Sequence, residues 1–165
     1  MNRARKVLIF AGTLLAAFGM LYGLHYAVFV EHQTLDGMGG SLARAFTNAG
    51  EGRAGDSRLA LTAYRDIKYT YVRQVDLHSH WIGLAMLMIV LGVVFDEVAF
   101  GERARFAIAL AMLLGSIVFP LGVILQTARM AGLGSVLAIA GSAIVIGALG
   151  ATAVGFMKDD KGGAT

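Results

Sequence analysis

Four long apolar runs without Asp, Glu, Lys or Arg limit this chain more than any other feature of its sequence. They cover residues 7–30, 81–95, 106–128 and 130–157. An α-helix needs about 20 apolar residues to cross the hydrocarbon of a bilayer, and each run, with its uncharged flanks, approaches or exceeds that length. Inside lipid the backbone has to satisfy its own hydrogen bonds, so such a segment is helical. We therefore predict four spans, at about residues 7–30, 77–96, 105–128 and 131–157.

The composition agrees with a chain whose solvent is lipid. Only 15% of the residues are charged, whereas a soluble domain has about 25%. Small residues recur at every fourth position of the last run, as Ala143, Gly147, Ala151 and Gly155. Such stripes let membrane helices approach closely, so we expect this one to be a seam inside the bundle or, in part, toward another subunit. The predicted fold is an all-α integral membrane four-helix bundle that forms a single domain over residues 1–165.

The positive charges near the span ends predict the orientation. One side of the predicted topology carries seven of them, and the other short connection, between the last two spans, carries only Arg129. The seven are Arg3, Arg5, Lys6, Arg103, Arg105, Lys158 and Lys161. Because Lys and Arg accumulate on the cytoplasmic side, we place both termini in the cytoplasm, in a multi-pass protein of the inner (plasma) membrane. The first run then serves as an uncleaved signal anchor.

The segment between the first two spans, residues 31–76, lies on the outer side in this topology. Its first half is rich in glycine, so residues 31–55 are predicted to be mostly loop, with one short helix around residues 41–47. Asp56 or Ser57 can then cap a helix that continues to Val75. The apolar residues of this helix recur at helical spacing: Leu61, Tyr64, Ile67, Tyr71 and Val75. We expect an outer amphipathic helix that lies on the membrane surface or covers the outer end of the bundle.

All four histidines are predicted to lie at one membrane level, near the outer face. His25 and His80 differ in depth by about one turn when the helical rise is applied, so they are the best pair to bridge one haem or to form the core of a metal site. His32 and His78 lie nearer to water and are the alternative, a surface copper site. Because the chain has no cysteine, thiolate ligands are excluded. The histidines can also be ordinary hydrogen-bonding anchors at the interface.

The stretch Asp76-Leu77-His78-Ser79-His80-Trp81-Ile82-Gly83-Leu84-Ala85-Met86 resembles the start of a haem-ligand helix. Such helices occur in subunit I of haem-copper oxidases and nitric oxide reductases, and similar His-x-His openings occur in small bacterial membrane proteins. The resemblance covers about fifteen residues and implies a haem-type histidine near the outer face. The chain has too few spans and histidines for a second haem and a copper, so it does not imply oxygen or nitric oxide reduction by this chain alone.

Two function classes remain in view. The first is a small membrane subunit that binds haem b or copper through these histidines and serves electron transfer within a larger complex. The alternative is a non-catalytic structural or assembly subunit of a membrane complex, without a cofactor of its own. A transporter is the weakest hypothesis, because no span carries a charged residue that would mark an ion path. The partners expected are the lipid bilayer and other membrane subunits or further copies of the chain, not nucleic acid, and we do not expect an enzyme that acts alone.

Overall fold

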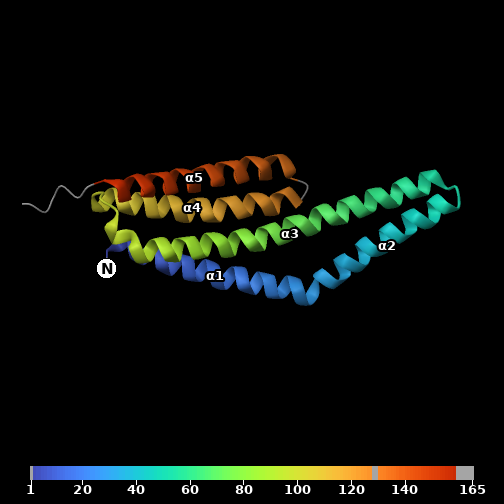
Figure 1. The fold of residues 1–165 in the computed structure, drawn as a ribbon, viewed down its shortest axis with the longest axis horizontal. Coiled ribbons are helices and arrows are strands. Elements are labelled where there is room, and N and C mark those ends of the chain that lie inside the picture. Colours follow the sequence, from blue (N-terminus) through green and yellow to red (C-terminus); the bar gives the residue numbers. More distant parts are fainter. Residues whose placement is uncertain (1, 128–129, 159–165) are drawn as a thin grey trace, which may run out of the picture. The chain divides into compact units, whose positions relative to one another are not determined.

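The computed structural model describes residues 2–127 and 130–158, which are helical almost throughout. The elements are α1 (Arg3–Phe29), α2 (Glu31–Gly50), α3 (Ala54–Val94), the short 3₁₀ helix η1 (Phe95–Glu97), α4 (Glu102–Thr127) and α5 (Ala131–Met157), shown in Figure 1. By length and composition, α1, α3 with η1, α4 and α5 can each cross a membrane. The all-α fold and the four apolar helices predicted from the sequence are therefore confirmed. Ala128, Arg129 and Lys161, which entered those predictions, lie outside the described residues.

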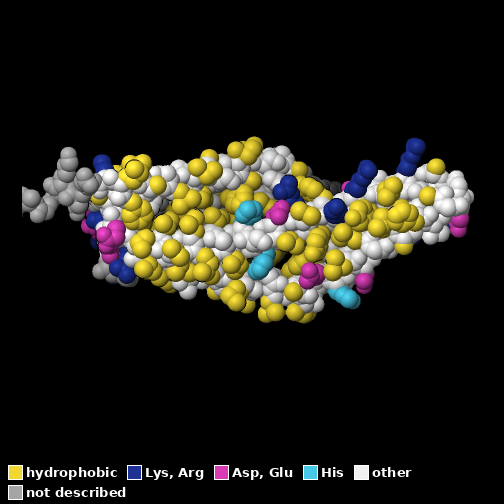
Figure 2. Space-filling view, viewed as in Figure 1, with side chains coloured by type: hydrophobic (Ala, Val, Ile, Leu, Met, Phe, Trp, Pro, Cys, Tyr) yellow, Lys and Arg dark blue, Asp and Glu magenta, His cyan; other side chains and the backbone are white. Residues whose placement is uncertain are grey.

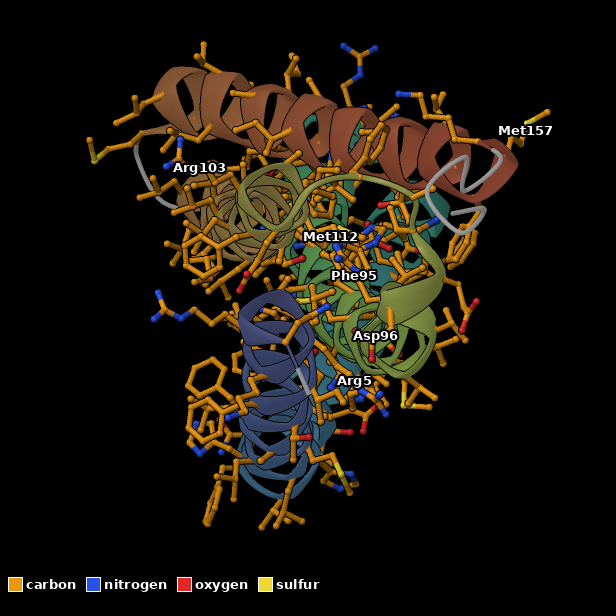
Figure 3. All side chains as sticks on the ribbon, turned by 90° about the vertical axis from the view of Figure 1, so that its left-hand side faces the viewer. Arg5, Phe95, Asp96, Arg103, Met112 and Met157 are labelled. Carbon is orange, nitrogen blue, oxygen red and sulfur yellow. The ribbon has the colours of Figure 1, made fainter. Side chains whose placement is uncertain are left out.

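The chain divides into two compact units, and each is described by itself. Unit 1 comprises Met1–Gly19 and Ser79–Thr165, and unit 2 comprises Met20–His78. Whether they form one membrane domain, as the sequence predicts, stays a prediction. Four α-helices and η1 contribute to the buried core of unit 1, and Phe95 and Met112 of this core are labelled in Figure 3. The core residues are Ala4, Leu8, Met88, Phe95, Val98, Ala109, Met112, Val145 and Ala148.

Helices α4 and α5 pack along a seam of glycines in unit 1. A Cβ atom added to Gly122 would lie 2.8 Å from the Cα of Ala138, and one added to Gly141 would lie 2.7 Å from the Cα of Phe119. Because these neighbours are backbone atoms, no larger residue fits without separating the helices. The buried positions of α5 alternate at spacings of four and three, as in coiled coils: Gly134, Ala138, Gly141, Val145, Ala148, Thr152 and Gly155.

Only some of the small residues predicted to form a stripe on α5 belong to this seam. Gly155 is buried and Ala151 is half-buried, but Ala143 and Gly147 are exposed. A Cβ added to Gly147 would meet nothing within 4 Å. The prediction of an internal seam is therefore wrong for Ala143 and Gly147. The physical reason is that α5 contains small residues on two faces, and the tighter backbone contacts of Gly134 and Gly141 decide which face packs against α4.

Unit 2 corrects the prediction of a glycine-rich loop. Residues 31–50 form the regular helix α2, and only the turn that follows it departs from helical backbone. Packing outweighs the low helix propensity of glycine here: Ile67 of α3 lies over Gly37, and Ala45 is buried. Ser57 ties the two helices together by donating a hydrogen bond of 2.9 Å to the carbonyl oxygen of Ala45. Gly52 has a φ of 73°, which explains why a glycine stands in the turn.

Helix α3 begins at Ala54, close to the predicted start of the outer helix, but does not end at Val75. It continues without interruption into the second apolar run and contains 41 residues. On its first half Tyr64, Ile67 and Tyr71 are half-buried, whereas Leu61 and Val75 of the predicted apolar face are exposed. No residue between Val75 and Leu77 breaks a helix, so the end that the sequence analysis placed there has no structural basis.

Candidate functional site

The most closely packed histidine of unit 2 is His78, on α3. Its imidazole lies against α1 at Gly23, where a Cβ would come within 2.7 Å of Nδ1 and 3.0 Å of Nε2. Any side chain at position 23 would therefore displace the ring. The nearest ring atom to that added Cβ is Cε1, so this edge of the imidazole faces α1. His78 is positioned here as part of the packing between α1 and α3.

Two tyrosines of α1, one turn apart, flank this contact. The Tyr22 hydroxyl donates a hydrogen bond to Oε1 of Gln74. The Tyr26 ring packs near that of Tyr71, with 6.5 Å between the ring centroids. The Tyr26 hydroxyl is buried beside the hydroxyl of Thr34. The Thr34 hydroxyl itself donates to the carbonyl oxygen of Val30 at 2.9 Å.

These tyrosines and Gln74 were not among the site residues predicted from the sequence. One signal was present: Tyr22 and Tyr26 are four residues apart, and so are Gly19 and Gly23, which places each pair on one helix face. Figure 2 shows the surface hollowed where α1, α2 and α3 of unit 2 approach one another. Tyr22 and Tyr26 thus lie on the face of α1 that packs against α3.

His25 and His32 lie apart from this cluster. His25 is exposed on α1, and its ring lies 5.3 Å from that of Phe29 between centroids. Two residues along a helix correspond to about 200°, so His25 points away from the face on which Gly23 meets α3. The His32 side chain is 90% exposed, and its Nε2 lies 3.9 Å from a carboxylate oxygen of Asp36.

His80 belongs to unit 1 and packs against α4. Its ring meets that of Phe119 edge to face, with 4.7 Å between the centroids. The predicted partners His25 and His80 thus belong to different units, and their pairing stays a prediction. Residues 2–127 and 130–158 contain no group of three or more His, Cys, Asp or Glu side chains placed to hold a metal ion.

The opposite end of unit 1 holds an ordered polar network around Asp96, shown with Arg5 in Figure 3. The Asp96 carboxylate pairs with Arg5 at 2.8 Å and accepts a hydrogen bond of 2.6 Å from the Asn2 amide. Asn2 also caps α1 by accepting the backbone N–H of Arg5 at 2.8 Å. Arg105 donates to the Asp96 carbonyl oxygen at 3.3 Å. The structure therefore connects the starts of α1 and α4 with the end of α3 at one side of the unit.

The connection between α3 and α4 is held in the same region. The backbone N–H of Ala99 donates to the carbonyl oxygen of Gly155 at 2.9 Å, and Lys158 lies 5.1 Å from the centroid of the Phe100 ring. Most of the basic residues that predicted the cytoplasmic side are therefore near one another in unit 1.

Comparison with protein-family models, with curated proteins and with solved structures gave no match. The function is therefore inferred from the chemistry of the chain itself.

Proposed function

We propose that this chain is a multi-pass membrane subunit that presents an outer helical arm to a partner protein. In this proposal four helices form a transmembrane bundle in the plasma membrane, and both termini lie in the cytoplasm. The outer arm is residues 31–76, which include α2 and the first half of α3. The observation that carries the proposal is α3, one helix that is charged in its first half and apolar in its second.

The length of α3 supports an arm outside the hydrocarbon. At 1.5 Å per residue its 41 residues measure about 60 Å, twice the roughly 30 Å of a bilayer core. The charge-free part from Leu77 to Phe95 is long enough to span. The part before it carries seven charged side chains, which are costly in lipid: Asp56, Arg58, Arg65, Asp66, Lys68, Arg73 and Asp76.

Exposed apolar side chains near the turn of the arm support a protein partner. Phe46, at the end of α2, and Leu59, near the start of α3, are each 71% exposed. The Ser57–Ala45 hydrogen bond joins the parts of α2 and α3 from which these side chains project, close to the turn of the arm. Figure 2 shows apolar side chains on this hairpin among basic ones. Large apolar groups that stay exposed on a charged segment are typical of interaction sites.

Site-specific photo-crosslinking in living cells tests the proposal. A photoreactive amino acid at Phe46 or Leu59 should give one discrete protein adduct, and the same group at Thr62, an exposed polar position on α3, should not. The Leu59→Asp variant should reduce the adduct formed from position 46. Adducts with lipid alone would place the arm on the membrane surface and contradict the proposal.

The second candidate function is haem or copper binding through His25 and His80, with electron transfer within a larger complex. The observation that favours it is that both imidazoles are exposed, and each lies beside a phenylalanine ring, which suits the apolar face of a porphyrin. His32 and His78 would form the alternative metal site. Unlike His25 and His80, His78 is packed against the backbone of another helix at Gly23.

An absorption spectrum of the purified chain, oxidised and then reduced with dithionite, tests this second function. Sharp reduced bands that disappear in His25→Ala and His80→Ala but persist in His32→Ala would support it. Protein that contains neither haem nor copper when prepared together with its natural partners would contradict it.

A further inference from the structure

A basic pocket lies at the starts of α1 and α4 in unit 1. Arg3, Glu102, Arg103 and Phe106 line it, and its volume is about 370 Å³. Two positive and one negative side chain give the lining a net charge of +1. The N-terminal ends of both helices add partial positive charge at the same place. The pocket is therefore suited to a singly charged anion.

The two arginines of this pocket differ from their neighbours. Arg5 pairs with Asp96 at 2.8 Å, and Arg105 donates to the Asp96 carbonyl oxygen. No ion pair of Arg3 or Arg103 is recorded within residues 2–127 and 130–158, and both side chains are exposed. Figure 3 shows Arg103 pointing away from the Arg5–Asp96 pair. Two of these four arginines thus hold the fold together, while the other two are available to a ligand.

An apolar groove follows the basic pocket along the same two helices. Its volume is about 600 Å³, and it is lined by Val7, Phe10, Ala11, Leu14, Leu15 and Phe18 of α1 and by Leu113 and Ile117 of α4. By the helical rise, Val7 and Phe18 lie about 6 Å and about 22 Å beyond Arg3. One leaflet of the hydrocarbon is roughly 15 Å thick, so the groove covers the depth of an acyl chain.

We propose that the pocket and the groove together bind one phospholipid whose net charge of −1 is that of its phosphodiester. Arg3 and Arg103 contact the phosphate, and one acyl chain lies between α1 and α4. The planar guanidinium groups suit phosphate oxygens, and the apolar walls suit the chain. Neither feature alone distinguishes a lipid from a free anion or from a general apolar surface. Along α1 and α4 the basic pocket comes first and the apolar groove follows. This order matches the charged headgroup and the acyl chain of a phospholipid. This inference does not depend on the outer arm or on the histidines.

Native mass spectrometry of the full chain in detergent tests the inference. Phosphatidylglycerol should form a one-to-one adduct, while zwitterionic phosphatidylethanolamine should bind at least tenfold more weakly. The double variant Arg3→Ala/Arg103→Ala should weaken phosphatidylglycerol binding at least tenfold. The control Lys6→Ala/Arg58→Ala removes the same number of positive charges from exposed positions outside the pocket and should change binding less than twofold. An equal loss in both double variants would overturn the proposal, because binding would then depend on overall charge.

Two further measurements separate a lipid from a free phosphate. Leu14→Trp fills the groove without changing any charge, and because Leu14 is 62% exposed, the fold should tolerate it. This variant should lose phosphatidylglycerol while keeping the circular dichroism spectrum of the parent. Neither inorganic phosphate nor glycerol 3-phosphate should displace the lipid at millimolar concentration. Displacement by either anion, or unchanged lipid binding in Leu14→Trp, would overturn the proposal.

Discussion

The two helix hairpins of this protein, α4–α5 in unit 1 and α2 with the first half of α3 in unit 2, are both rich in glycine but use it in opposite ways. In α4–α5, Gly122 and Gly141 stand where backbone meets backbone. In α2, Gly39 and Gly50 have nothing within 4 Å of an added Cβ. Lipid provides no hydrophobic force between helices, so an apolar hairpin depends on close approach. The hairpin of α2 and α3 is held instead by side chains such as Ala45 and Ile67, and open positions such as Gly39 and Gly50 make no close backbone contact.

The largest expected effect is at the α4–α5 seam. Gly141→Leu forces a side chain into the backbone of α4 and should cost at least about 3 kcal/mol, enough to abolish folded protein. The matched variant Gly147→Leu changes the same residue type on the exposed face of the same helix and should shift stability by less than about 0.5 kcal/mol. Thermal unfolding of the two purified variants in detergent, followed by circular dichroism, measures the difference. Similar melting temperatures would mean that the seam is misplaced.

The next largest effect is at the contact between α1 and α3 in unit 2. Gly23→Ala places a methyl group against the His78 ring and should destabilise the protein by about 1–3 kcal/mol. The double variant Gly23→Ala/His78→Ala should recover much of this loss, because the clash is removed. The coupling energy of a double-mutant cycle provides the readout. Additive effects would show that the two residues are not in contact.

A smaller effect is expected at the hydrogen bond that links α2 to α3 within the outer arm. Ser57→Ala removes the donor to the Ala45 carbonyl and should cost about 1 kcal/mol. Thr62→Ala is the control, because the Thr62 hydroxyl bonds only within its own helix, to the carbonyl oxygen of Arg58. Protease cleavage of the arm should accelerate in the first variant and not in the second. Equal protection in both would argue that α2 does not pack on α3 at this point.

The smallest expected effects are at two glycines of unit 2, one inside α2 and one in the turn that follows it. Gly39→Ala adds a methyl group in open space on a helix and should stabilise the protein by about 0.5–1 kcal/mol. Gly52→Ala should destabilise it, because position 52 has a positive φ. Thermal unfolding measures both variants. The melting temperature should rise in Gly39→Ala and fall in Gly52→Ala. A loss of stability in Gly39→Ala would mean that α2 is not the helix described.

The apolar helices could be predicted from the sequence because the length of a charge-free run is a direct physical requirement of a bilayer. Helix α2 could not, since its glycines oppose a helix locally and only packing such as that of Ile67 over Gly37 reverses this. The continuation of α3 beyond Val75 was missed for a different reason. A change from charged to apolar composition marks a change of solvent, and it was mistaken for a break in the helix.

The candidate site was predicted only in part. Helical rise gives the position of each histidine along its helix, but not the direction in which the side chain points. Direction depends on which face of α1 packs against α3, and Gly23 and Tyr22 decide that face. His25, two residues further along, consequently points elsewhere. The Tyr22–Gln74 hydrogen bond joins residues far apart in the sequence, and no local pattern indicates it.

Labelling of single cysteines tests most directly the central claim, four spans with the arm outside and both termini inside. The chain has no cysteine, so each introduced one reports alone. On intact cells a membrane-impermeant maleimide should label Ala49→Cys in the arm and Gly132→Cys at the start of α5. Glu97→Cys and Lys158→Cys should be labelled only after the membrane is permeabilised. Labelling of Ala49→Cys and Glu97→Cys from the same side of the membrane would contradict the account.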